Sequence, residues 1–298
     1  MCAATFDRHA ITGAAPGRET RGTADAHAWA AAEVALRDDH AAFALRLAPA
    51  HARDRATLLA AIGLCALAGE TPDRPFSVVE AQLRACPVTP QDDPLVAGAC
   101  TLVRDGVFDA GSLVDLFDSI ATLSCGPFPT WDALQAALRL AATNTAKALT
   151  RLGIGDGRTN ALASLFMGYT AARRLARVGA DVASRGFSPV LTLDTGLTPA
   201  VAREWRTKPN EPHVRRRTAD ELRAIATRAR AWLLASRPLG DSAEMWATWY
   251  LRAIGDATLD AVARERFVTL WTTAEVYPST AAFLRCKARV GSVLRPRG

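Results

Sequence analysis

Several kinds of sequence feature are scarce in this 298-residue chain. Runs of β-branched residues are few, and no segment alternates convincingly between apolar and polar residues as a β-strand does. Alanine is abundant and 49% of the residues are hydrophobic, so a helical protein with a normal core is expected. The sequence predicts an all-α chain of about ten helices in one domain.

Motifs for metals and nucleotide phosphates are also lacking. The five histidines form no HExxH and the six cysteines no CxxC, so we expect no metal site of the His/Cys kind. The GIGDG stretch at 153–157 follows no strand and departs from GxGxxG, which argues against a phosphate loop. Without a regular cysteine framework, a reducing compartment is expected, with the internal cysteines as buried small side chains: Cys65, Cys86, Cys100 and Cys125.

No charge-free window of about 18 residues is apolar enough to span a bilayer. Residues 1–24 lack a hydrophobic signal core, and we interpret them as a disordered leader. Residues 25–284 are predicted to form the helical domain, and residues 285–298 a basic tail that is solvated and disordered or contacts a membrane. The net charge of +6 permits an anionic partner without proving one.

Helical periodicity, caps and breakers place the helices. Within the domain we expect N-caps at Ser112, Thr130, Thr198 and Thr218, the last with Glu221 in a capping box. The expected helices are residues 24–48, 53–67, 76–86, 95–104, 112–123, 131–152, 160 to the glycine-terminated loop near 186, 199–207, 218–235, 242–254 and 256–271.

The helix from Asn160 has an unusual face. At 100° per residue, Phe166, Thr170, Arg173 and Arg177 lie on one side, so two arginines continue an apolar stripe. Inward arginines are costly unless they meet an anion, a carboxylate or water. Either they snorkel to solvent, or they line a basic cavity.

Three stretches together resemble the squalene/phytoene synthase superfamily. They are RDRATLLAAIGLCALAGETPD (53–73), FPTWDALQAALRLAATNTAKALTRLGI (128–154) and NALASLFMGYTAARRLARVGADVASRGFSP (160–189). The resemblance implies the helical isoprenoid-synthase fold with a central cavity between two Asp-rich, Mg²⁺-binding helices. It also places four cavity-lining residues, although core packing is the safer interpretation of Tyr169: Phe43, Leu64, Phe166 and Tyr169.

The departures from that family pattern concern the metal ligands. Glu70 and Asp73 are the acidic remnants of the first motif. In the second motif the expected ligand positions fall on Arg173 and Arg177, and Asp181 alone keeps a carboxylate. Arginines repel Mg²⁺, so no metal or cofactor is expected. The arginine pair is predicted to face Glu70 and Asp73 across the core, with Asp181 near the rim.

The degenerate pattern resembles the branch that holds the mitochondrial assembly factor for respiratory complex I and its bacterial relatives. This resemblance implies a non-enzymatic assembly or interaction role, with a respiratory-chain assembly intermediate as partner, a lipid or isoprenoid as ligand, and peripheral membrane contact. The implied location is the mitochondrial matrix or inner-membrane periphery in a eukaryote, and the cytoplasmic membrane periphery in a bacterium. The alternative is a prenyltransferase that binds isoprenoid diphosphates through Mg²⁺ on the remaining acids, or through Arg173 and Arg177.

Nucleic-acid binding would rest on Arg215, Arg216 and Arg217. No helix-turn-helix, RNP motif or mixture of aromatic and basic residues accompanies them, so nucleic acid is an unfavoured partner. The triplet is better interpreted as a solvated loop before Thr218.

Overall fold

The computed structural model describes residues 40–45, 47, 94–123, 126–152, 157–237, 239 and 245–294. These residues form helices and turns, with no strand among them. The predicted leader, the helices at 53–67 and 76–86, and most of the helix at 24–48 lie outside them. Of the predicted helix at 24–48, the structure describes α2 (His40–Leu45).

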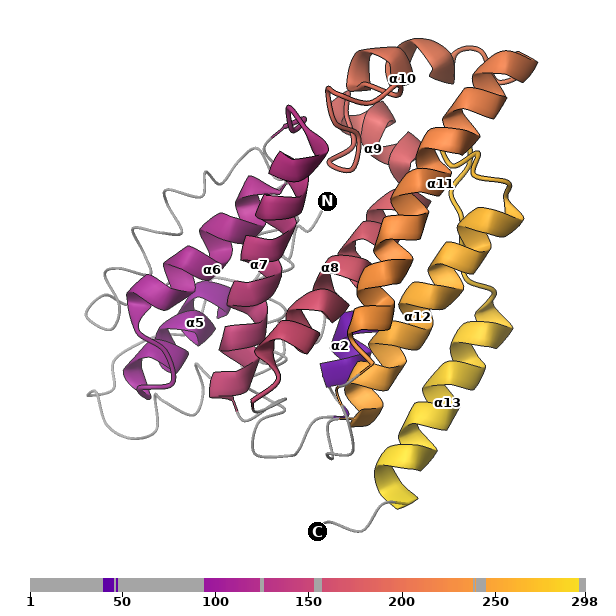
Figure 1. Cartoon of the computed structure of the whole chain (residues 1–298). Helices are drawn as coiled ribbons and strands as arrows, with labels where there is room; N and C mark the ends of the chain where they lie inside the picture. Colours follow the sequence, from indigo (N-terminus) through magenta and orange to yellow (C-terminus); the bar gives the residue numbers. More distant parts are fainter. Residues whose placement is uncertain are drawn as a thin grey trace, which may run out of the picture.

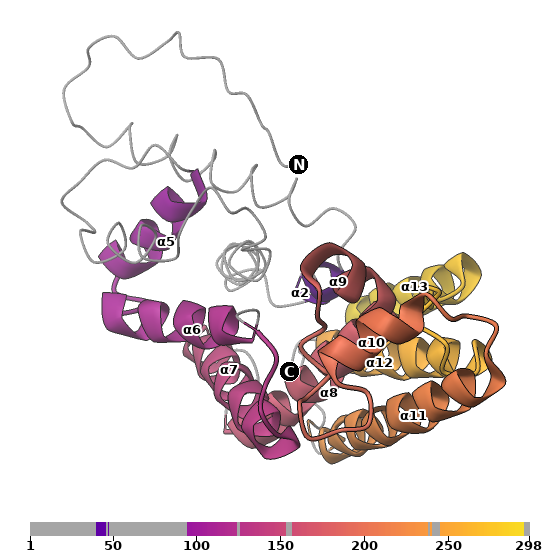
Figure 2. The same cartoon turned by 90° about the horizontal axis from the view of Figure 1, so that it is seen from above.

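Helix α8 (Thr159–Ala176) lies in the middle of the bundle. It packs against α7 (Trp131–Arg151) on one side and against α11 (Pro212–Ala235) and α12 (Met245–Arg264) on the other (Figure 1). Helices α5 (Pro94–Arg104) and α6 (Ala110–Thr122) extend the α7 side, and α13 (Pro278–Leu294) covers α12. The short helices α9 (Val178–Arg185) and α10 (Pro199–Arg206) lie at one end of the bundle (Figures 1 and 2).

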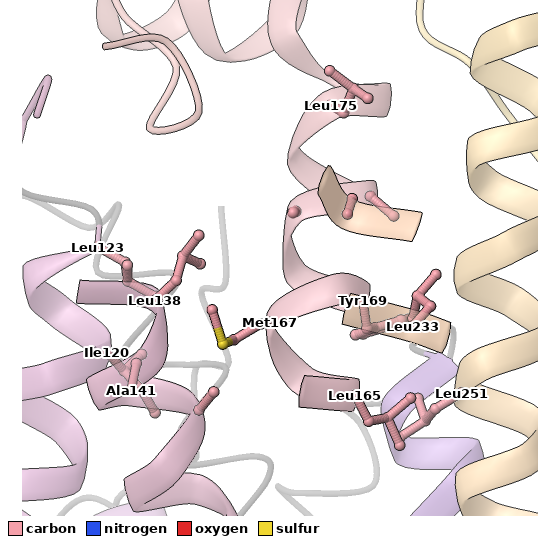
Figure 3. Close-up of a cluster of buried hydrophobic side chains, with 14 of the residues drawn as sticks. Ile120, Leu123, Leu138, Ala141, Leu165, Met167, Tyr169, Leu175, Leu233 and Leu251 are labelled. Carbon is pink, nitrogen blue, oxygen red and sulfur yellow. The ribbon is translucent and has the colours of Figure 1, made fainter. Parts of the chain in front are cut away.

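The core depends on α8 having apolar side chains on opposite faces. Figure 3 shows Met167 pointing toward Leu138 and Ala141 of α7, while Leu165 lies near Leu251 of α12. A helix buried on two sides needs such a double stripe. Gly168 allows close approach of α11, since a Cβ there would lie 2.7 Å from Cγ of Leu233.

The predicted caps of α7 and α10 are confirmed. Thr130 accepts a hydrogen bond from the N–H of Ala133, and Thr198 accepts one from Val201. The predicted Ser112 cap is wrong, because α6 begins at Ala110 and the carboxylate of Asp109 accepts from the N–H and hydroxyl of Ser112.

The predicted start of α11 at Thr218 is wrong. The helix begins at Pro212, which suits the first turn because its missing N–H would have no partner there. Thr218 is fully buried inside the helix, and its hydroxyl has no hydrogen-bond partner among the described residues. Glu221 accepts instead from the N–H of Gly196. The arginine triplet is therefore an exposed part of a helix and not a loop.

The C-terminal helices also differ from prediction. One helix, α12, runs through Gly255, where a break was expected, because the small residue packs against Leu233. Helix α13 was not predicted; residues 285–294 belong to it and are not a disordered end. Cys100 is buried, as expected of a small internal side chain, but its sulfur is in a disulfide.

Candidate functional site

The carboxylate of Asp181 is held in place at the junction of α8 and α9. It is 4% exposed, and its Oδ1 lies 3.6 Å from Nη1 of Arg174. Its Oδ2 accepts a 3.1 Å hydrogen bond from the hydroxyl of Ser188. The expectation that Asp181 lies near the rim was therefore wrong: both oxygens are engaged inside the protein.

A break between α8 and α9 allows this arrangement. In a continuous helix, Gly179 would donate its N–H to the carbonyl of Leu175. Here Thr269 separates the two, because its hydroxyl donates to the Leu175 carbonyl at 2.8 Å and its own carbonyl accepts from Gly179 at 2.8 Å. Insertion of a side chain into the ladder is a known cause of a helix break. Gly179 is required, since any Cβ would meet the carbonyl oxygen of Leu270.

The break changes which arginine serves the site. In a continuous helix Arg177 would be the natural partner of Asp181, since residues four apart are neighbours on one face, whereas here the Asp181 carboxylate meets Arg174. Arg173 is half-buried, with its guanidinium 5.7 Å from the ring centre of Tyr169. Arg177 is the exposed residue between the two helices. The single long helix with Arg173 and Arg177 on one face was therefore a wrong prediction, and the ion pair at this junction is Arg174–Asp181.

Burial dominates the electrostatics of that pair. It raises the pKa of Asp181 above its ordinary value, with Arg174 and the Ser188 hydrogen bond acting in the opposite direction. Burial likewise lowers the pKa of Arg174, opposed by Asp181 and aided by the neighbouring charges of Arg173 and Arg177. The positive charges of Arg174 and Arg177 therefore both act on this one carboxylate.

This part of the site does not fit Mg²⁺. Neither α8 nor α9 supplies a carboxylate besides Asp181, and that one is bound to Arg174 and Ser188. A hard divalent cation needs several oxygen ligands. No group of three His, Cys, Asp or Glu residues able to hold a metal occurs in the described part of the chain. Glu70 and Asp73 lie outside those residues, so their predicted pairing with the arginines stays a prediction.

A second cluster lies where α2 meets α12, close to α13. The ring of Phe43, which is 7% exposed, lies 4.7 Å from that of Tyr250. The Tyr250 hydroxyl is 2.8 Å from Nδ1 of His40 and accepts a 3.4 Å hydrogen bond from Nε of Arg285. The guanidinium groups of Arg285 and Arg289 lie 5.6 and 5.2 Å from the Phe43 ring centre. We name these five residues the Phe43 cluster.

The Phe43 cluster has the chemistry of an anion site with an apolar wall. Two guanidinium groups, an imidazole and a phenol supply donors, and stacking on Phe43 holds the arginines in place. Arginine binds phosphate oxygens through paired hydrogen bonds. The prediction had singled out Phe43 alone. The exposed Arg289 and half-buried Arg285 were assigned to a tail, and His40 was missed because a lone histidine carries no sequence signal.

The other predicted cavity residues have separate outcomes. Phe166 is half-buried at the edge of the core. Tyr169 is 5% exposed and lies beside Leu233 in the core, as the packing alternative predicted (Figure 3). Leu64 lies outside the described residues.

In the described part of the chain, no helix is long and apolar enough to cross a bilayer.

Comparison with solved structures identifies the fold. A dehydrosqualene synthase solved with a ligand matches with a TM-score of 0.67 and 14% identity, over 90% of this chain and 98% of that chain. YisP from Bacillus subtilis matches with a TM-score of 0.63 and 11% identity, over 91% and 100%. Squalene synthase HpnC from Alicyclobacillus acidocaldarius matches with 0.60 and 15%, over 84% and 97%.

No protein-family profile and no curated protein matches the chain. The fold is therefore established by structure, at identities too low to transfer an activity. The chain has the all-helical fold of squalene/phytoene synthase-like isoprenoid synthases.

Proposed function

We propose that this protein is a catalytically degenerate isoprenoid-synthase fold that acts as an assembly or interaction factor at a membrane periphery. Respiratory complex I assembly intermediates are the partner that the sequence resemblance favours. The protein works without a resident metal. Its location follows that partner: the mitochondrial matrix face of the inner membrane in a eukaryote, or the cytoplasmic face in a bacterium.

The observation that carries the proposal is the state of Asp181. Metal-assisted ionisation of a diphosphate needs carboxylates free to hold Mg²⁺ against the leaving group. Here the carboxylate is buried, paired with Arg174 and hydrogen-bonded to Ser188. Arg177 adds further positive charge near it, which repels a divalent cation. The pair has the form of a structural ion pair.

Product analysis tests the loss of chemistry. Pure full-length protein would be incubated with farnesyl or geranylgeranyl diphosphate and Mg²⁺, beside an active dehydrosqualene synthase as positive control. We expect neither C30 nor C40 product. Clear formation of either product by this protein would refute the proposal.

The partner is tested by affinity purification of the tagged protein from its native host. We expect subunits of respiratory-chain assembly intermediates to co-purify. A deletion strain should also lose assembled complex I, measured on native gels. Normal complex I in the deletion strain would contradict this part of the proposal while leaving the loss of catalysis intact.

A second candidate function is binding of an isoprenoid diphosphate without its turnover. The Phe43 cluster favours it, because guanidinium groups suit the diphosphate and the aromatic rings suit the isoprenoid chain. The test is isothermal titration with a non-hydrolysable farnesyl thiodiphosphate, without Mg²⁺. Arg289→Gln should weaken binding roughly tenfold, since charge-assisted hydrogen bonds contribute about 1.5–3 kcal/mol. The exposed Arg216→Gln is the matched control, and equal binding by both variants would reject this function.

A further inference from the structure

The outer face of α13 carries large apolar side chains in solvent. Phe283 is 64% exposed and Val290 is 56% exposed, and the free thiol of Cys286 is exposed near them. At 100° per residue the three lie within about 60° of one another. We call Phe283, Cys286 and Val290 the α13 outer stripe. Ala288, on another face of the helix, is fully buried.

Exposed hydrophobic residues are concentrated at this helix. Of the six large ones in the described part of the chain, Tyr277, Phe283 and Val290 fall within residues 277–290, while the others are scattered over other segments. Scattered surface hydrophobic residues are normal, but a contiguous group marks a site of interaction. At one end of the group, the guanidinium of Arg264 lies 3.8 Å from the ring centre of Tyr277.

Basic side chains border the stripe on both sides. On the helical projection Lys287 lies about 40° to one side of Phe283 and Arg289 about 60° beyond Cys286 on the other. Both are exposed while their cations rest near aromatic rings, Lys287 at 5.1 Å from Trp249 and Arg289 at 5.2 Å from Phe43. With Arg285, α13 carries three basic residues and no acidic one.

We propose that α13 is a peripheral docking helix for an anionic lipid bilayer. The α13 outer stripe enters the boundary between headgroups and acyl chains, and Lys287 and Arg289 contact lipid phosphates. An apolar face with lysine and arginine at its borders is the pattern of an interfacial helix. This inference deepens the membrane part of the proposed function and rests on it.

Charge and size favour lipid over two other occupants. A second copy of the chain would bring two helices of charge +3 together, and like charges repel. A stable protein interface buries about 800 Å² on each partner, more than three side chains on one helix provide. A bilayer needs only the stripe and the positive border. An acidic protein partner would satisfy the same charges and is a rival outcome of the test.

The test is flotation of the full-length protein with vesicles of phosphatidylcholine alone or mixed with phosphatidylglycerol. We expect binding to the anionic vesicles that weakens with salt. Phe283→Glu combined with Val290→Glu should reduce the bound fraction at least about tenfold, and Lys287→Gln should weaken binding about fivefold. Leu140→Glu is the matched control, since Leu140 is 55% exposed on α7, and it should bind as wild type does. Circular dichroism checks that each variant is folded.

Three results would overturn the proposal. The first is equal binding to neutral and anionic vesicles, or no binding to either kind. The second is unchanged binding by the Phe283/Val290 variant. The third is wild-type protein that binds polyglutamate but not vesicles, which would assign the face to an acidic protein. C30 or C40 product from the metal assay would refute the loss of catalysis and leave this result standing, so the two failures are distinguishable.

Discussion

At the scale of single residues, the position of Asp181 decides how the second motif is understood. Sequence alone showed a surviving carboxylate beside arginines and could not show which arginine it meets. Helical spacing predicts the neighbours of Asp181 only if one continuous helix runs from Asn160 past Asp181. With the break at Arg177, Arg174 is the partner, and it is half-buried while Asp181 is buried.

Asp181→Asn should change how stability depends on pH. Burial raises the pKa of Asp181 above its ordinary 3.8, so the folded protein keeps the proton at pH values where the unfolded chain has released it. The stability that this residue contributes is therefore full below 3.8 and declines as pH rises through its folded pKa. Asparagine does not titrate and still accepts from Ser188. The melting temperature of wild type minus that of the variant should therefore fall as the pH is raised above 3.8.

Thermal unfolding followed by circular dichroism at several pH values measures that difference. Asp194→Asn is a control, because this carboxylate is exposed and hydrogen bonds from Thr192 and Trp131 lower its pKa. Its wild-type-minus-variant difference should change in the opposite sense and at lower pH: it is full above 3.8 and is lost as the pH falls through the lowered folded pKa. A difference for Asp181 that grows with pH would show that Arg174 outweighs burial.

At the scale of elements, the insertion of Thr269 between α8 and α9 is the feature that organises the site. Thr269→Val keeps the shape but removes the hydroxyl that satisfies the buried Leu175 carbonyl. Leaving a buried acceptor without its donor costs about 1–3 kcal/mol. We expect urea denaturation to show that loss for Thr269→Val and a much smaller one for Thr269→Ser. Equal losses would mean that the methyl group, and not the hydroxyl, matters.

Helix α13 depends on a second close approach. A Cβ at Gly291 would overlap the indole of Trp246 on α12, so α13 docks only because residue 291 is glycine. Gly291→Leu should push α13 from α12. Hydrogen exchange should then rise in α13 while α7 and α8 keep their protection. Val290→Leu is the control, because Val290 is exposed on the outer stripe, and it should leave exchange in α13 unchanged.

Elements with local signals were predictable, and those set by distant contacts were not. Thr130 and Thr198 predict the starts of α7 and α10, because an N-cap hydrogen bond forms within four adjacent residues. The break after Ala176 comes from Thr269, which is distant in sequence. The start of α11 was misplaced because Thr218 and Glu221 form a capping-box pattern that tertiary contacts override. The Phe43 cluster likewise unites residues from α2, α12 and α13 that share no spacing.

At the scale of the whole molecule, α8 joins the two sides of the bundle. Its Met167 faces α7, and its Leu165 faces α12 (Figure 3). The fold class was predictable because helical periodicity and the order of motifs extend over most of the chain. The central place of α8 follows from its apolar residues on opposite faces, ten of which are buried.

That central position predicts one cooperative unfolding transition for both sides of the bundle. Met167→Ala and Leu165→Ala should each lower the free energy of unfolding by about 2–5 kcal/mol, because each leaves a cavity in a packed interior. Leu234→Ala, at a residue 45% exposed, is the control and should change it by less than about 0.5 kcal/mol. Within each variant, circular dichroism should give the same urea midpoint as tryptophan fluorescence, to which the stacked Trp131 and Trp232 of α7 and α11 contribute. If Met167→Ala shifted one probe and left the other in place, the α7 side would unfold independently and α8 would not couple the two halves.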